Sequence, residues 1–243
     1  MSEKTYFNKP FPKILPKLSK INKRISDKFM KIWHHELIKK KRYNLIEGFN
    51  HNYSAKSYYI NNLKIKIKTL ELGAGIGTQI SYENLSLQDY YCTELRSNLI
   101  KEIKKKYKTV RVIKCDIQKK LPFSSNFFDR INVVHVLEHL PNLPKCLSEV
   151  SRVLKPKGIF QIVIPCDPGL LYGFCRKISA ERVFKNNFKG SYSWLINREH
   201  INTPNEIIYE IKKNFKIIEK KFFPFVFPSI NLNLFIGLTV IKK

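Results

Sequence analysis

Five stretches of the chain have the pattern of hydrophobic and polar residues that is typical of β-strands in a sheet covered by helices. The first stretch, Lys64–Leu72, alternates polar and apolar residues, and the last, Leu154–Pro165, ends in an apolar run. Three further strands are predicted between them, at Asp89–Thr93, Val110–Lys114 and Arg130–Val134. These five strands form the predicted core of the protein.

The segments between these strands have the periodicity of helices. One predicted helix carries Leu99, Ile103 and Tyr107 on its buried face, and another covers Pro144–Leu154. A short helix is expected at Thr78–Leu85. Alternating strands and helices with right-handed crossovers predict an α/β fold, in which a mostly parallel sheet is covered on both faces. A ligand is expected at the carboxyl ends of the strands.

The C-terminal part of the chain predicts one helix and two strands. Thr203–Glu206 has the pattern of a capping box with proline at the first helical position, so a helix should begin there. The strands are expected near Lys216–Phe223 and Leu234–Lys242. The long uncharged run Phe222–Ile241 contains prolines and a glycine, and it therefore favours two strands joined by a turn over a membrane-spanning helix.

Residues 1–62 are predicted to be a basic extension before a domain at 63–243. Thirteen Lys or Arg stand against two acidic residues between Lys4 and Arg42. Apolar residues recur at helical spacing from Leu18 to Trp33, which predicts a basic amphipathic helix. Such a helix either lies on an anionic membrane or covers its own domain with its apolar stripe.

A glycine-rich turn follows the first predicted strand. Gly73, Gly75 and Gly77 stand at alternate positions, where the absence of side chains lets the backbone approach a ligand closely. The dinucleotide-binding pattern G-x-G-x-x-G/A is not met, because Thr78 occupies its sixth position, and no phosphate-binding P-loop pattern is present. Glu94 ends the second strand, 21 residues after Gly73, where α/β sheets place an acid for ribose hydroxyls.

Taken in order, these segments resemble the class I S-adenosylmethionine-dependent methyltransferases, especially those that act on small molecules. The similarity is carried by ELGAGIG, LPFSSNFFD, VLEHL and LKPKG, within Leu63–Pro165. It implies a Rossmann-like sheet of seven strands with an antiparallel last strand, and S-adenosyl-L-methionine as cofactor. It also implies a set of cofactor-binding residues: Glu71, Gly73, Ala74, Gly75, Gly77, Glu94, Leu95, Asp116, Ile117 and His135.

The resemblance gives each part of this set a role. Glu71 and the glycine turn match the motif that holds the methionine part, Glu94 matches the ribose acid, and Asp116 with Ile117 matches the adenine contact. Asp129 and the end of the fourth strand match the segment that faces the transferred methyl group. From the residues alone, Asp116 could instead be a turn or cap residue and Glu94 a solvated acid.

Methyl transfer needs two reactants held in line and, for a weakly acidic acceptor, a base. The candidate catalytic bases are His135, His139 and His200. His139 lies in VLEHL and is also readable as a structural residue, and an amine or carboxylate acceptor would need no base. No metal-binding pattern was identified.

Two segments are candidates for covering the site. Cys166–His200 is rich in aromatic and basic residues, so it is expected either to cover the methyl-transfer cleft or to pack against the sheet as a helical hairpin. Asn50–Tyr59 is expected to be a surface loop, which could also close over the cofactor with His51 and Tyr53.

The composition is strongly basic, with a formal net charge of +26 in 243 residues. This charge favours contact with nucleic acid, an anionic membrane or an acidic substrate, although a coding preference for lysine explains it equally well. The five cysteines are odd in number and form no C-x-x-C pair, which is typical of reduced intracellular thiols. With no apolar segment typical of a signal peptide at the N-terminus, we expect a cytoplasmic protein, peripheral to the membrane if its basic helix binds lipid.

Three functions are compatible with these patterns. The leading one is a methyltransferase for a small-molecule, sugar or lipid-linked acceptor. An RNA methyltransferase or basic nucleic-acid-binding protein is the second, although Asn132–Glu138 lacks the [DN]-P-P-[YF] motif that binds a flipped base. The third is a non-catalytic protein that uses the fold for interaction or membrane attachment.

Overall fold

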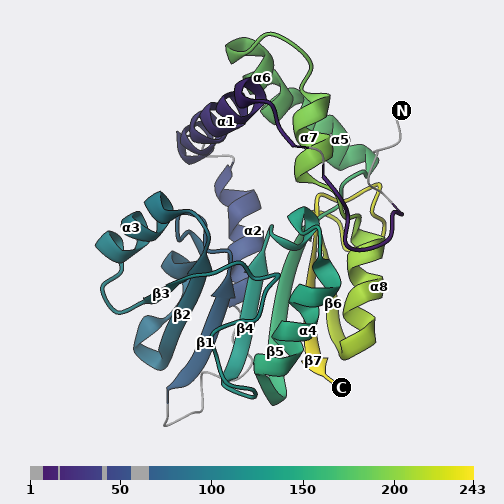
Figure 1. Cartoon of the computed structure of the whole chain (residues 1–243). Helices are drawn as coiled ribbons and strands as arrows, with labels where there is room; N and C mark the ends of the chain where they lie inside the picture. Colours follow the sequence, from purple (N-terminus) through teal and green to yellow (C-terminus); the bar gives the residue numbers. More distant parts are fainter. Residues whose placement is uncertain (1–7, 16, 40–42, 56–65) are drawn as a thin grey trace.

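The computed structural model describes residues 8–15, 17–39, 43–55 and 66–243. Its centre is one sheet of seven strands in the order β3-β2-β1-β4-β5-β7-β6 (Figure 1). The strands are β1 (Ile67–Leu72), β2 (Gln88–Glu94), β3 (Arg111–Lys114), β4 (Phe128–Val134), β5 (Leu154–Pro165), β6 (Phe215–Phe223) and β7 (Phe235–Lys242). Only β7 runs against its neighbours, β5 and β6. The predicted Rossmann-like, mostly parallel sheet with an antiparallel last strand is therefore confirmed.

Helices cover both faces of this sheet, and a further group of helices lies beyond the carboxyl ends of its strands (Figure 1). The α-helices are α1 (Lys20–Lys39), α2 (Tyr43–Ala55), α3 (Ser97–Lys106), α4 (Leu143–Val153), α5 (Leu170–Arg176), α6 (Arg182–Asn187), α7 (Ser193–Glu199) and α8 (Pro204–Asn214). Short helical turns of other types are η2 (Gln79–Tyr82), η3 (Leu85–Leu87), η4 (Leu137–His139) and the π-helical η5 (Lys177–Glu181).

The strands divide the core into two layers because successive side chains point to opposite faces. In β2, Tyr90 and Cys92 pack with Ile103 of α3. Tyr91, between them, joins the larger cluster on the other face, which includes Leu147 of α4 and other residues of α4 and α8. The buried apolar runs in the sequence therefore belong to strands that are covered on both sides.

The helical cover, formed by α1, α5, η5, α6 and α7, has a core of its own. Phe29 of α1 packs edge-on against Phe184 of α6 and Tyr192, which directly precedes α7. Phe29 is only 3% exposed, so much of the apolar stripe of the predicted basic helix is used within the protein. Of the two expectations for this helix, the structure supports burial on its own chain, although Ile21 stays exposed.

Two local predictions were wrong. Asn50–Ala55 is not a surface loop but the second half of α2, because Ile46, Phe49 and Tyr53 recur at helical spacing and pack on the sheet. Residues 56–59 of the expected loop lie outside the described part. The expected helix at Thr78–Leu85 is reduced to η2, because Glu83 turns into extended backbone and its side chain enters a buried ion pair.

The C-terminal predictions are confirmed. At the start of α8, Thr203 Oγ1 accepts a hydrogen bond from the Glu206 amide, and Glu206 accepts one from the Thr203 amide. The uncharged run Phe222–Ile241 is divided between the end of β6, a loop and β7. Within the described ranges, no helix combines the length and the apolar content required to cross a bilayer.

Candidate functional site

The glycine turn lies where β1 ends, at the carboxyl edge of the sheet. Gly73, Gly75 and Gly77 have φ values of +69°, +58° and +79°, a region that side chains disfavour. A Cβ atom on Gly73 would lie 2.8 Å from the side chain of Val136. A Cβ atom on Gly75 would have no protein atom within 4 Å. Ala74 between them is buried, so the turn offers open space at Gly75 alone among the three glycines.

Glu94, at the end of β2, holds this turn. Its Oε2 accepts a hydrogen bond from the Gly75 amide at 2.9 Å, and its Oε1 accepts from the amides of Leu95 and Arg96. The carboxylate is 5% exposed, so it is not the solvated acid of the alternative interpretation. Oε2 keeps a second lone pair beside Gly75, which suits a hydroxyl donor such as ribose. Leu95 itself is 59% exposed.

Asp116 and Ile117 follow β3 at the same edge of the sheet. Asp116 Oδ1 accepts hydrogen bonds from the backbone amide of Gln118 at 3.0 Å and from the side-chain Nε2 of Gln118 at 3.3 Å. Asp116 therefore stabilises a turn, as one of the two interpretations stated, and its assigned contact with adenine stays a prediction. Ile117 is buried at 8% exposure beside it.

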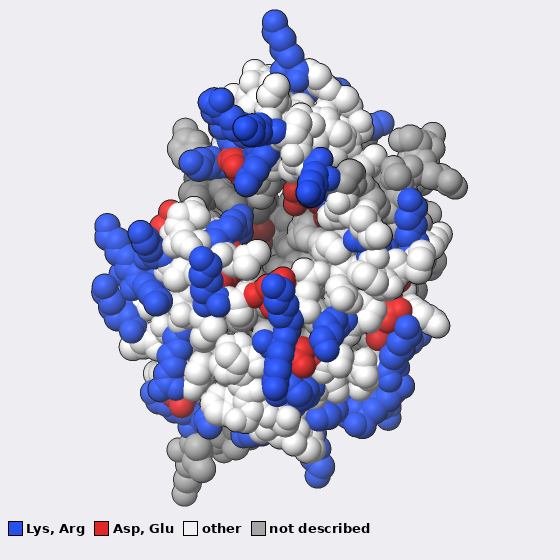
Figure 2. All heavy atoms as spheres, viewed as in Figure 1, with Lys and Arg blue, Asp and Glu red and all other residues white. Residues whose placement is uncertain are grey.

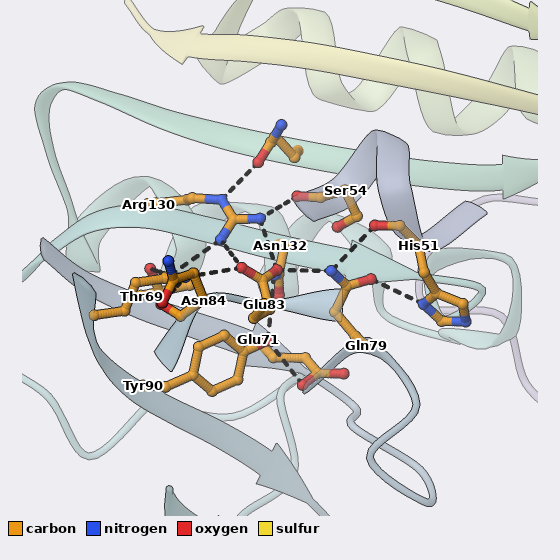
Figure 3. A network of polar contacts seen from close by, with 12 residues as sticks. His51, Ser54, Thr69, Glu71, Gln79, Glu83, Asn84, Tyr90, Arg130 and Asn132 are labelled. Atoms are coloured by element: carbon orange, nitrogen blue, oxygen red, sulfur yellow. Dashed lines mark hydrogen bonds and ion pairs between the residues drawn. The ribbon is translucent and has the colours of Figure 1, made fainter. Parts of the chain in front are cut away.

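Glu71 points into a buried polar network rather than toward solvent (Figure 3). Its Oε2 accepts a hydrogen bond from the Tyr90 hydroxyl at 3.0 Å. Burial and, less strongly, the nearby Glu83 carboxylate raise the pKa of Glu71 to about 8, against the lowering effect of the Tyr90 hydrogen bond. The residue is therefore largely protonated at neutral pH, and an ammonium group placed beside it would favour its ionised form.

We expect the Glu71→Gln variant to be more stable than the wild type at pH 8, by on the order of 2 kcal/mol. The unfolded chain loses this proton near pH 4.5, whereas the folded protein keeps it to about pH 8, so Glu71 reduces stability progressively as pH rises through that window. Urea unfolding at pH 5 and pH 8 measures the difference. The exposed Glu102→Gln is the control, and an equal gain at both pH values would contradict the raised pKa.

At the centre of the network, Arg130 of β4 and Glu83 form an ion pair with both side chains at most 5% exposed. Arg130 donates to Glu83 Oε1 and Oε2 at 2.9 and 2.8 Å, and to Gln161 at 2.6 Å (Figure 3). It also donates to the Ser54 carbonyl of α2. The network thus joins α2, the segment after the glycine turn and four strands, β1, β2, β4 and β5.

His51 connects α2 to η2, the short helix that follows the glycine turn. The His51 ring contacts Gln79 Oε1 at 2.8 Å and Glu47 at 2.6 Å, and Gln79 donates to Glu83 at 2.7 Å. Tyr53 instead lies against β7, where a Cβ atom on Gly237 would be 2.7 Å from its ring. The sequence predicts that His51 and Tyr53 could lie in a loop over the cofactor turn, but both lie in α2.

A second group of polar side chains lies beyond the end of β4, around Glu138 of η4. His135 Nδ1 is 3.5 Å and His139 Nε2 is 3.8 Å from Glu138 Oε1. The His139 and His200 rings have centroids 5.1 Å apart. His135 has a φ of +54°, a backbone conformation that is uncommon for residues other than glycine. The fold therefore brings together all three histidines named from the sequence.

Glu138 and Asp167 organise this group, although neither is among the site residues predicted from the sequence. Asp167 Oδ2 accepts a hydrogen bond from His200 Nδ1 at 2.9 Å, and Arg176 donates to Asp167 Oδ1 at 2.8 Å. Burial opposes ionisation of Glu138, but His139, His135 and His200 outweigh it and lower its pKa to about 2. Burial, together with His139, lowers the pKa of His200, against the pull of Asp167. The spacing H-x-x-E-H at 135–139 was the available signal.

Backbone hydrogen bonds fix His200 next to η4. The amides of Ile201 and Asn202 both donate to the Glu138 carbonyl, at 2.9 and 3.1 Å. The Asn202 side chain donates to the carbonyls of Leu137 and Leu140, each at 2.8 Å. The group is therefore preorganised by two segments about 60 positions apart in the sequence.

The glycine turn and the histidine group share one edge of the sheet. Val136, inside the H-x-x-E-H segment, is the residue whose side chain packs on Gly73. Aromatic residues also contact the histidine group: the Phe235 ring is edge-on to His135, and the Tyr172 ring lies near His200. Figure 2 shows a hollow between the helical cover and the sheet on this face of the molecule.

Comparisons with known proteins match the central part of the chain to a family model. Residues 70–162, from β1 to β5, match the family model described as a methyltransferase domain. A sterol 24-C-methyltransferase of Gibberella zeae is 28% identical over 128 residues, which cover 48% of this chain and 33% of that protein. A demethylmenaquinone methyltransferase of Leptospira interrogans is 30% identical over 108 residues, or 41% of this chain and 43% of that protein. The matches thus span less than half of either relative.

Solved structures share the fold. The PH0226 protein of Pyrococcus horikoshii has a TM-score of 0.56 at 16% identity, covering 84% of this chain and all of that one. The CurJ carbon methyltransferase has a TM-score of 0.55 at 19% identity, covering 76% of this chain and 51% of that one. The bare turn at Gly75 beside Glu94 fits S-adenosylmethionine, the methyl donor that this domain implies. Residues 70–162 therefore match a methyltransferase domain, within a fold that the solved structures share.

Proposed function

We propose that the protein is an S-adenosylmethionine-dependent methyltransferase acting on a small-molecule acceptor that has an apolar body. The observation that carries this proposal is the position of the glycine turn, which is open at Gly75 and in contact through Val136 with the group of three histidines. A cofactor cradle and candidate bases then belong to one site.

The protein's own residues would bind and orient the reactants. The cofactor supplies an activated methyl group on its sulfonium. The backbone at Gly75 leaves space for it, Glu94 offers an acceptor for ribose hydroxyls, and Glu71 offers a carboxyl group that ionises next to an ammonium. His135 is 29% exposed at the end of β4, where it is placed to take a proton from an acceptor. The assigned roles of these residues stay predictions.

The surroundings of the histidines support an apolar acceptor, lipid-linked rather than a free sugar. Tyr172 and Phe235 pack against each other and against the histidine rings. The loop between β6 and β7 exposes Phe225, Val226 and Phe227, which would suit contact with a lipid chain. The names of the two relatives, one for sterols and one for a quinone, agree with an apolar ring system as acceptor.

The net charge favours a second candidate, methylation of RNA. Figure 2 shows lysine and arginine side chains spread over this whole face rather than gathered around the hollow. A nucleic-acid site is expected to concentrate them along the strand's path. The charge therefore supports RNA methylation less well than the site geometry supports a small-molecule acceptor.

Membrane contact through α1 has little support, because Phe29 of this helix is buried. We propose a cytoplasmic location, which agrees with the five cysteines being free thiols.

Incubating the protein with methyl-labelled S-adenosylmethionine and a cell extract tests the proposal. We expect label in the organic-soluble, low-molecular-weight fraction, and none when the Gly75→Val variant replaces the wild type. Label only in RNA, removed by ribonuclease, would assign the second candidate instead. A wild type that binds S-adenosylhomocysteine in calorimetry but labels nothing would point to a non-catalytic role.

A further inference from the structure

Glu138 is an unusual residue for the inside of a protein. Its side chain is 2% exposed, and within the described ranges neither carboxylate oxygen accepts a hydrogen bond. The nearest basic atom, His135 Nδ1, is 3.5 Å away, too far for a good hydrogen bond. A buried carboxylate that accepts no hydrogen bond carries a large desolvation cost, which a bound cation would offset.

Two histidines complete a set of ligands around this carboxylate. One ligand atom each from Glu138, His139 and His200 lies within 4.8 Å of the other two. Ligands of a tetrahedral cation with bonds of about 2.1 Å are separated by about 3.4 Å, so the three side chains need to approach by only about 1 Å. Two imidazoles and one carboxylate are the ligands of catalytic zinc sites that keep a position open.

The outer ring nitrogens of both histidines are already engaged. His139 Nδ1 is 2.6 Å from the Glu199 carbonyl, and His200 Nδ1 is 2.9 Å from Asp167, which pairs with Arg176. Carbonyl and carboxylate oxygens only accept, so in the neutral form of each ring Nδ1 carries the proton and Nε2 keeps a free lone pair. Metal-binding histidines are held in this way, by a hydrogen bond from the nitrogen that does not bind the metal.

We propose that Glu138, His139 and His200 bind one divalent transition-metal cation of the zinc, cobalt and manganese class. The inference deepens the proposed function and rests on it for the reaction, although not for the binding of the metal. It assigns a site that the sequence did not predict. Two of these ligands lie in the same segment as Val136, whose side chain packs on Gly73 of the glycine turn.

Such a cation indicates a hydroxyl or enol oxygen as the acceptor. At the open position, such a cation would lower the pKa of this oxygen, and the released proton would pass to solvent. The oxygen forms a bond to the methyl carbon, the carbon–sulfur bond breaks, and its electron pair stays on sulfur. The products are the O-methylated acceptor, S-adenosylhomocysteine and one proton, with no change in the metal's oxidation state.

Calorimetry with Zn²⁺, Co²⁺ and Mn²⁺ on the EDTA-treated full chain tests the site without any substrate. We expect saturable binding of one cation per chain, and for Co²⁺ the visible absorption of a site with four or five ligands. Glu138→Gln and His200→Ala should lose this binding. Asp167→Asn should weaken it by about 10–100-fold because it removes the partner of His200 Nδ1. Glu181→Gln, a carboxylate paired with Lys185 on the surface, is the matched control and should bind as the wild type does.

Two outcomes would overturn the proposal. The first is no saturable binding of any of the three cations, in which case Glu138 only pairs with protonated histidines. The second is binding that survives in Glu138→Gln and His200→Ala, which would place the cation elsewhere. Calorimetry with S-adenosylhomocysteine on the same proteins separates this proposal from the function, because Glu138→Gln should still bind it. If the protein binds the metal but not S-adenosylhomocysteine, the proposed metal site stands and the proposed methyltransferase function is rejected.

Discussion

We expect the Gly75→Val variant to lose S-adenosylmethionine binding, with an affinity at least about 100-fold weaker than that of the wild type. A side chain at this position meets no protein atom within 4 Å, so it projects into the space assigned to the cofactor. The fold should remain, although a φ of +58° costs a branched residue about 1–2 kcal/mol. Calorimetry with S-adenosylhomocysteine and thermal unfolding measure the two effects separately.

Gly190→Val is a matched control for this experiment. Gly190 also has a positive φ, +104°, and a Cβ atom there would also meet nothing within 4 Å. It lies in the turn between α6 and α7, outside the predicted cofactor site. This variant should therefore pay a similar conformational cost and bind the cofactor normally. If both variants bind equally well, the cofactor does not lie at Gly75.

The Arg130→Met variant should lower the free energy of unfolding by about 3–5 kcal/mol. Methionine fills much of the same space, but Glu83 is left as a buried charge without its partner. Removing both charges, in Arg130→Met with Glu83→Leu, should recover a large part of that loss, because the stranded carboxylate is then gone. Urea unfolding of the wild type, the single and the double variant measures the difference.

An exposed pair gives the comparison. Lys155 Nζ lies 2.6 Å from Asp129 Oδ1, but the two side chains are 40% and 34% exposed. Lys155→Met should therefore cost less than about 1 kcal/mol. Equal effects of Lys155→Met and Arg130→Met would show that burial of the Glu83–Arg130 pair is not what makes it important.

The sheet was readable from the sequence because each strand carries its own evidence. Apolar runs such as Leu154–Pro165 must be covered on both faces, and Thr203–Glu206 contains the atoms that cap its own helix. The glycine turn was equally local, since three glycines at alternate positions have few other uses. These features depend on neighbours within a few residues, which a sequence displays directly.

The contacts that complete the site depend on distant residues. Arg130 is a charge inside an apolar strand and so requires a partner, but nothing local identifies Glu83, 47 positions earlier. The spacing of His135, Glu138 and His139 is visible in the sequence. The position of His200 beside them is not, because it depends on the hydrogen bonds of residues 201–202 to η4. α2 was misread because its apolar spacing begins before Asn50, where the polar loop seemed to start.

The position of β7 has a consequence for how the protein is made. β6 reaches the sheet only through β7, which pairs with β5 on one side and β6 on the other. During synthesis, β6 therefore leaves the ribosome before β7, the one strand that pairs with it in the described part of the chain, and the edge of β5 stays open. The nascent chain exposes these unpaired backbones until β7 emerges, and this interval is when chaperones should bind it most strongly.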